Sequence, residues 1–144
     1  MRSVADFYQD CQAVAHAVPP LDVKLADAVS CVLAEDVQAP FNLPVADLSA
    51  CDGYAVRVRD CEGATLETPV TLPVTEEIRA GAVDPAALVP GTAIRIASGA
   101  PMPTGAEAVV SLEFTDHGVA QVALRTAPAS GENIRRRAED VAQG

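Results

Sequence analysis

The chain has 144 residues, of which 49% are hydrophobic and only 3% aromatic, and it contains no Trp. This composition can form a folded core and argues against disorder, and the length suits one domain or two small ones. The formal net charge is −10. We therefore expect no binding to the nucleic-acid backbone, which needs a basic face.

The sequence shows neither a secretory leader nor an apolar stretch long enough to span a bilayer, which predicts a soluble cytoplasmic protein without a membrane partner. The four cysteines contain no C-x-x-C pair, a poor pattern for zinc. In a cytoplasmic chain we expect reduced thiols that are mostly buried. They are Cys11, Cys31, Cys51 and Cys61.

Apolar residues recur every three or four positions over 3–18, which predicts an amphipathic helix that begins at an N-cap, Ser3. Pro19 and Pro20 should end it. A second helix is expected over 27–34, where apolar residues share one side. A loop rich in turn-forming residues should follow over 39–49.

Alternating or β-branched runs then predict five strands, at 54–58, 69–74, 92–97, 108–114 and 119–124. Two prolines, Pro69 and Pro73, indicate that the second of these is an edge strand. The segment 116–118 is expected to be a hairpin turn between the last two strands. The predicted fold is α+β and mainly β: a small β domain, 46–129, inserted into a helix-containing domain made of 1–45 and 130–144.

Three segments carry polar groups that could do chemistry. In the first, 49–56, Gly53 is expected to take positive φ before a strand and to leave the carboxylate of Asp52 pointing outward, although most Asp-Gly pairs are simple turns. The second, 98–106, is a stiff loop whose amides could face an anion and whose hydroxyls include that of Ser98. The alternative is that this loop only shapes the fold and binds no ligand.

The third segment, 131–144, holds three consecutive arginines followed by Glu139 and Asp140. The arginines could hold a phosphate or carboxylate, or they could pair with the acidic residues beside them. The two histidines, His16 and His117, lie far apart in the sequence, and a metal or base role for either is improbable.

In this order, the segments resemble the family of molybdopterin molybdenumtransferases that includes MoeA and the gephyrin E domain. The run SACDGYAV at 49–56 is similar to the family's SAMDGYA segment. RIASGAPMPTGAEAVV at 95–110 resembles RI-x-TGAP-x-P-x-GADAVV, and NIRRRAEDV at 133–141 resembles N-(I/V)-R-x-x-GED. The opening LADAVSCVLAEDV at 25–37 is similar to AxGRVLAEDV.

The resemblance implies the first two domains of a four-domain enzyme that inserts molybdate into adenylated molybdopterin with the help of Mg²⁺, and that works as a homodimer. It implies catalytic roles for Asp52, which would also hold the metal, and for Ser98. Substrate binding would fall to Gly99, Ala100, Pro101, Glu139 and Asp140. A molybdopterin adenylyltransferase is the implied protein partner.

The chain departs from the family pattern at Leu48, Cys51, Ser98 and Ala138. Ser98 keeps the hydroxyl of the family's Thr, whereas Ala138 stands where a Gly can supply positive φ or close packing. We expect the sequence to be cut inside a longer protein and to be inactive alone, because the pterin-binding domain is missing. The alternatives are a free-standing scaffold that docks on a partner with that domain, and a plain structural domain.

Overall fold

The computed structural model describes residues 2–144 and divides the chain into two compact units, Met1–Val37 and Gln38–Gly144. Each unit is described by itself below. The boundaries proposed from the sequence, with an inserted domain at 46–129, stay a prediction. No helix in the described residues is both long enough and apolar enough to cross a membrane.

The first unit contains one α-helix, α1 (Val4–Val14), whose start agrees with the sequence pattern. The Ser3 hydroxyl accepts the Asp6 amide, and the Asp6 carboxylate accepts the Ser3 amide, so a capping box satisfies two N-terminal N–H groups. The helix ends at Val14, with Ala15 as its C-cap, so it is shorter than the predicted 3–18 and stops before the two prolines that were expected to end it.

The second helix predicted at 27–34 is wrong. A 3₁₀ turn, η1 (Leu25–Asp27), stands at its start, and turns and bends follow it. Its apolar side chains stay exposed, including Val29, Val32 and Leu33. An isolated helix of eight residues is unstable without a surface to pack against, and within the first unit these side chains have none.

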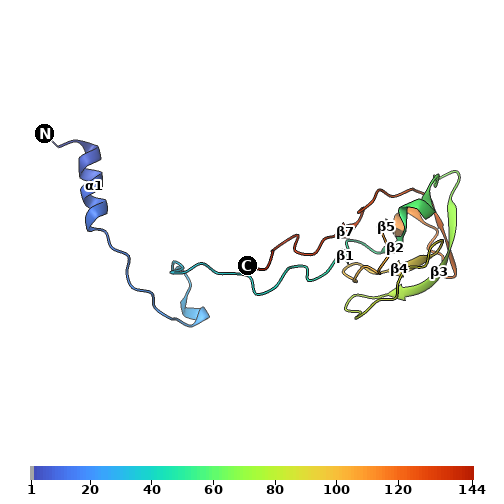
Figure 1. The fold of residues 1–144 in the computed structure, drawn as a ribbon, viewed down its shortest axis with the longest axis horizontal. Coiled ribbons are helices and arrows are strands. Elements are labelled where there is room, and N and C mark those ends of the chain that lie inside the picture. Colours follow the sequence, from blue (N-terminus) through green and yellow to red (C-terminus); the bar gives the residue numbers. More distant parts are fainter. Residues whose placement is uncertain (1) are drawn as a thin grey trace. The chain divides into compact units, whose positions relative to one another are not determined.

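The second unit is built on a five-stranded sheet with the order β5-β2-β4-β3-β6 (Figure 1). The mainly β character expected from the sequence is confirmed. The strands are β2 (Gly53–Val56), β3 (Val70–Ile78), β4 (Ala93–Ile96), β5 (Ala108–Ser111) and β6 (Gln121–Leu124). Two short 3₁₀ helices, η2 (Val58–Cys61) and η3 (Leu112–Phe114), follow β2 and β5.

Strand β3 is not the edge strand that its prolines suggested. Its first half pairs with β6, up to Pro73 opposite Gln121, and its second half pairs with β4 from Val74 onward. Pro73 therefore lies where the strand changes partners. Proline, which has no N–H to donate, is tolerated at this position because the pairing with β6 ends there and the pairing with β4 begins at the next residue.

The expected hairpin between the last two strands is also wrong, because β5 pairs with β2 instead. The chain does reverse at 116–118, where the Asp116 carboxylate accepts the amides of Gly118 and Ala123. This reversal pairs Thr115, which follows η3, with Leu124 of β6. Since β5 and β6 end the strand order, this bridge shows that the sheet curls round on itself.

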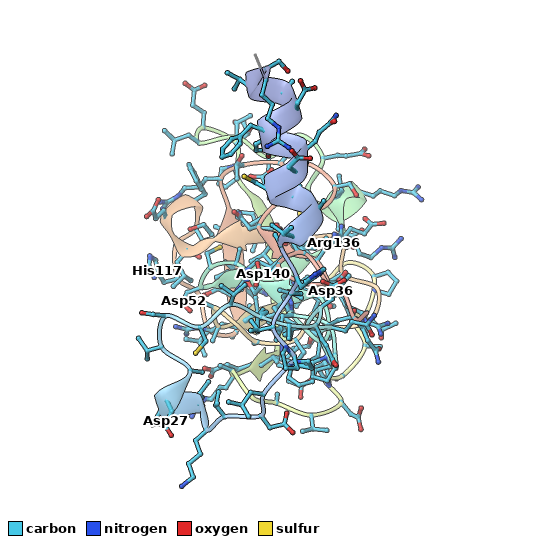
Figure 2. All side chains as sticks on the ribbon, turned by 90° about the vertical axis from the view of Figure 1, so that its left-hand side faces the viewer. Asp27, Asp36, Asp52, His117, Arg136 and Asp140 are labelled. Carbon is cyan, nitrogen blue, oxygen red and sulfur yellow. The ribbon has the colours of Figure 1, made fainter. Side chains whose placement is uncertain are left out.

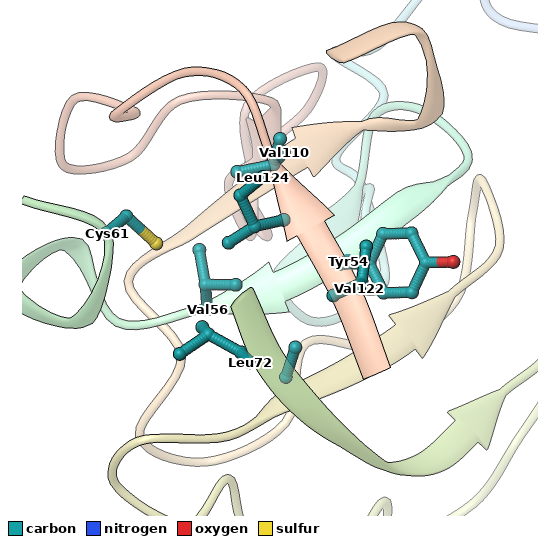
Figure 3. Packing of buried hydrophobic residues seen from close by; sticks show 8 residues of the cluster. Tyr54, Val56, Cys61, Leu72, Val110, Val122 and Leu124 are labelled. Carbon is teal, nitrogen blue, oxygen red and sulfur yellow. The ribbon is translucent and has the colours of Figure 1, made fainter. Parts of the chain in front are cut away.

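The curled sheet buries apolar side chains on both faces. One cluster includes Tyr54, Val56, Val110, Val122 and Leu124, all at most 1% exposed (Figure 3). The buried phenol of Tyr54 donates a hydrogen bond to the Gly118 carbonyl at 2.8 Å. The other cluster, on the opposite face, contains Ala55, Ile78, Leu88, Ile94, Ile96, Ala100 and Val109. All four residues of β2 are buried, so both clusters depend on this strand.

The cysteines differ from the expectation that most are buried. Cys61 is buried, Cys51 is half-buried, and Cys11 and Cys31 are exposed. Burial raises the pKa of the Cys61 thiol to about 11, and the nearby Asp60 adds to the rise. This thiol is therefore protonated at neutral pH and contributes to the core as a small apolar group.

Gly53 is needed for space and not for the positive φ that the sequence suggested, since it lies in β2 with ordinary strand geometry. A Cβ added at Gly53 would stand 2.2 Å from the Val110 carbonyl oxygen and 2.9 Å from Cγ1 of Val109. Real Cβ atoms do not approach a backbone oxygen so closely. The pairing of β2 with β5 therefore requires a residue without a side chain.

We expect Gly53→Ala to lower the free energy of unfolding by more than about 2 kcal/mol, because neighbouring backbone must move. Gly63→Ala is the matched control: Gly63 has φ +78 but open space around it, so only local strain of about 1 kcal/mol applies. Urea unfolding measures both variants. Equal losses for the two would show that the close approach at Gly53 has no energetic weight.

Candidate functional site

The structure brings together the two residues proposed as catalytic. The Ser98 amide donates a hydrogen bond to Oδ1 of Asp52 at 2.8 Å, across 46 positions in the sequence. The Ser98 hydroxyl is 3.3 Å from the Ala50 carbonyl, to which it donates. Asp52 lies just before β2, and Ser98 follows β4, the strand beside it. Both residues are exposed, so a ligand could reach them.

The loop after β4 does not present the row of open amides that the sequence suggested. The Gly99 amide donates to the Ser49 carbonyl at 2.8 Å, and that of Met102 donates to the Asp47 carbonyl at 3.0 Å. The amide of Ala100 is also bonded within the loop. The amides of Gly99 and Met102 hold the loop against residues 47–50, so of the two readings left open by the sequence these contacts favour the structural one.

A short strand, β1 (Leu48–Ser49), joins this loop to the return segment 131–144. On one side Leu48 bridges Pro101, and on the other it pairs with Arg135 of β7 (Ile134–Arg135). Asp140 forms an ion pair with Arg135, and Glu139 accepts the Arg136 amide at 2.8 Å. Glu139 and Asp140 therefore lie across β1 from the Ser98 loop, and neither forms a hydrogen bond or an ion pair with Asp52 within residues 2–144.

Asp47 fastens the return segment to the strand region. Figure 2 labels two residues of that segment, Arg136 and Asp140. Its carboxylate accepts the Arg137 amide at 2.8 Å and pairs with the Arg136 guanidinium at 2.7 Å. These hydrogen bonds lower the pKa of Asp47 below its ordinary value of 3.8. Of the two uses considered for the arginines, pairing with acidic residues is the one seen for Arg135 and Arg136.

Ala138 has φ 65, in the left-handed region, and its amide donates to the Pro44 carbonyl at 3.0 Å. The sequence raised the possibility that this position needs positive φ, and the structure confirms it. A Cβ makes this conformation costly by roughly 1–2 kcal/mol. The departure from Gly at this position therefore stores local strain beside Glu139.

A shallow surface pocket of about 190 Å³ opens beside Asp52. Asp52, Gly53 and Leu112 line it from one side, and the ends of β3 and β4 line it from the other with Glu77, Arg95, Ile96 and Ala97. In the sequence Arg95 stands between Ile94 and Ile96 in an alternating run, but the motif reading gave it no role. The alternation of that strand was a usable signal, because the face shared by Arg95 and Tyr54 leads to Asp52.

The Asp52 carboxylate could supply part of the coordination of a Mg²⁺ ion. Asp52 is exposed, and its Oδ1 takes the Ser98 amide, which leaves Oδ2 for another ligand. Mg²⁺ commonly takes one or two carboxylates together with water and substrate phosphates. Within residues 2–144 no three His, Cys, Asp or Glu side chains group as a metal site. Asp52 could therefore supply one ligand of a site that other groups complete.

The family model described as the MoeA N-terminal region, domains I and II, matches residues 2–144. The chain belongs to this MoeA family. Molybdopterin molybdenumtransferase 2 of Mycobacterium tuberculosis (strain H37Rv) is 51% identical over 144 residues, which cover all of this chain and 36% of that protein. Molybdopterin molybdenumtransferase of Bacillus subtilis (strain 168) is 40% identical over 126 residues, which cover 85% of this chain and 29% of that protein.

A solved structure of the molybdopterin biosynthesis moeA protein of Pyrococcus horikoshii OT3 has a similar fold. Its TM-score is 0.77 and its identity 38%, over 85% of this chain and 32% of that one. This MoeA-family chain thus spans about a third of the length of the relatives it matches. The family resemblance inferred from the motifs is confirmed.

Ala138→Gly should raise the free energy of unfolding by about 0.5–1 kcal/mol. Glycine removes the left-handed strain, which outweighs the greater entropy it gives the unfolded chain. Ala129→Gly is the control, since Ala129 is exposed and is not among the positive-φ residues, so it should lose stability. Thermal and urea unfolding measure both. A loss of stability in Ala138→Gly would contradict the strain argument.

Asp47→Ala should cost about 1 kcal/mol of stability near neutral pH, since the contacts are partly exposed. Because folding lowers the pKa of Asp47, its contribution is complete above the ordinary value of 3.8 and disappears as pH falls through the lowered pKa. The difference between wild type and variant should therefore shrink below about pH 4.

Urea unfolding at several pH values measures this difference. Glu67→Ala is the control for the loss of a charge, because Glu67 is exposed and makes no ion pair or side-chain hydrogen bond within residues 2–144. A difference for Asp47→Ala that stays constant down to pH 2 would rule out the ionised carboxylate as its source.

Proposed function

We propose that this chain supplies one wall of the active site of a molybdopterin molybdenumtransferase, which transfers molybdate to adenylated molybdopterin in molybdenum cofactor biosynthesis. The observation that carries the proposal is the Asp52–Ser98 contact, made by the two segments that match the family's motifs. The relatives that carry this activity in their names are about three times as long. The chain alone is expected to be inactive, and the remainder of the enzyme would complete the site.

Asp52 has two tasks in this proposal. One carboxylate oxygen holds the loop after β4 through the Ser98 amide, and the other faces outward to a ligand. Mg²⁺ bound there would neutralise anionic oxygens of the substrate and help to hold them. Ser98 would offer its hydroxyl oxygen as an acceptor, or rotate to donate to an oxyanion.

The loop residues Gly99, Ala100 and Pro101 serve mainly as support. Ala100 is buried in the second core cluster, and Gly99 and Pro101 are fixed to β1. A substrate would therefore meet a rigid surface, which preserves the geometry of Asp52 and Ser98. Glu139 and Asp140 would bind substrate only where it extends past β1.

The complete protein would work as a cytoplasmic homodimer and receive its substrate from a molybdopterin adenylyltransferase. The apolar side chains of α1 are exposed in the chain by itself, Val4 at 88% and Phe7 at 59%, and such a surface suits assembly with further protein. A free-standing scaffold that docks on a pterin-binding partner is the alternative. The experiment below separates the two.

The test replaces the matching N-terminal third of the Mycobacterium tuberculosis relative with this chain. The hybrid is expressed in a bacterial host that lacks its own molybdenumtransferase, and the activity of a molybdenum-dependent reductase is measured. We expect the hybrid to restore the reductase and this chain alone to fail. A folded hybrid that restores nothing would contradict the proposal and favour the scaffold.

Asp52→Asn in the same hybrid separates charge from structure. Asparagine can still accept the Ser98 amide, so the fold should survive, whereas activity should fall at least about tenfold because the charge is lost. Asp60→Asn is the matched control, since Asp60 likewise accepts a backbone amide, that of Gly91 at 2.8 Å, away from the pocket. Equal activity of the two variants would contradict a catalytic role for the Asp52 carboxylate.

A further inference from the structure

We propose that Arg95 holds an anionic, tetrahedral oxygen group of the ligand in the pocket beside Asp52. The inference rests on the proposed function, which it deepens by naming the residue that binds the phosphate or molybdate group. Arg95 is at the centre of β4, between Tyr54 of β2 and Glu77 of β3. It lines the pocket of Asp52 and also the neighbouring one, which Val74, Thr75 and Val119 help to form.

The guanidinium of Arg95 is available to a ligand. Within residues 2–144 it takes part in no ion pair, and no hydrogen bond from it is formed. In the described residues, every buried side-chain nitrogen or oxygen atom has a hydrogen-bond partner. The guanidinium nitrogens of Arg95 have no such partner, so they are not buried. They must therefore reach solvent. Arg95 is half-buried and its backbone is fixed in a central strand, while its guanidinium group remains accessible to an anion.

The position of the positive charge is supported by its effect on Tyr54. Burial raises the pKa of the Tyr54 phenol, whereas the charge of Arg95 acts in the opposite direction. The guanidinium is thus close enough to the Tyr54 phenol to act on it electrostatically. It is the only cationic side chain that lines either pocket in the described part of the chain.

The two carboxylates in the pocket do not cancel this role. Glu77 forms an ion pair with Arg79 at 3.5 Å, and Asp52 already accepts the Ser98 amide. The lining of the pocket thus carries both signs of charge, with Arg95 on β4 and the Asp52 carboxylate just before β2. Such a pocket fits a ligand with an anionic oxygen group facing Arg95 and a bound divalent cation or an N–H group facing Asp52.

The first experiment titrates the isotope-labelled chain with sodium molybdate, with AMP, and with AMP plus Mg²⁺, and follows the Arg95 Nε–H and Ser98 amide signals by NMR. We expect both signals to move. A response to molybdate alone identifies the metal oxyanion as the group bound, and a response to AMP that Mg²⁺ strengthens identifies the nucleotide phosphate. If neither anion moves the Arg95 signal, the proposal is overturned.

Variants then test the residue. Arg95→Gln should weaken the binding of the responding anion at least tenfold, and Arg95→Lys should keep part of it because the charge remains. Arg57→Gln is the matched control: Arg57 is also half-buried and forms no ion pair within residues 2–144, but it lines neither pocket. Equal binding by Arg95→Gln and Arg57→Gln would overturn the proposal.

The hybrid enzyme distinguishes this inference from the proposed function. If the hybrid is active and Asp52→Asn reduces activity, while Arg95→Gln leaves the KM for molybdate and for the adenylated substrate unchanged, only the role of Arg95 fails. If the folded hybrid is inactive but the chain still binds the anion through Arg95, the proposed function fails and the anion site stands. A rise in KM of at least tenfold in Arg95→Gln supports both.

Discussion

The burial of β2 on both faces is the constraint on which the rest of the second unit depends. Of its residues, Tyr54 and Val56 belong to one apolar cluster and Ala55 to the other, while the strand pairs with β4 and β5. Each fully buried aliphatic or aromatic side chain contributes about 1.5–3 kcal/mol. The strand therefore cannot shift by one residue without exchanging one cluster for the other, which fixes its register.

The same constraint places the candidate site. Gly53 must approach the Val110 carbonyl closely, and the chain enters β2 directly through Asp52. The pairing of β2 with β4 then brings the end of β4 beside this entry, so that the Ser98 amide reaches the Asp52 carboxylate. A hydrogen bond to a charged acceptor is stronger than one between neutral groups, and here it ties the loop after β4 to the entry of β2.

Around this contact the molecule supports the site in two ways. The loop after β4 is fixed to β1 by its amides, and the return segment is fixed to the other side of β1 by its strand pairing and by Asp47. The site is thus rigid where Asp52, Ser98 and Arg95 lie, and it is open to whatever completes it. The half-site proposed for this chain agrees with its length, which is about a third of that of its relatives.

The sequence alone determined the family, several of the strands and the start of the helix α1. The motifs at 49–56, 95–110 and 133–141 identified the family, and the alternating run at 92–97 predicted a strand, which the structure has as β4. The capping pattern at Ser3 located the start of α1. These features are local: each depends on residues within one turn or one strand, so a single stretch of sequence suffices to specify it.

The tertiary structure alone decided the rest. The helix expected at 27–34 is absent because a short amphipathic segment needs a partner surface, which no local pattern reveals. Gly53 is required by a carbonyl of β5 more than 50 residues away, and the role proposed for Arg95 depends on β2, β3 and β4 lying side by side. Pairing between distant strands is set by burial on both faces of the sheet, and a linear sequence does not record which strands will meet.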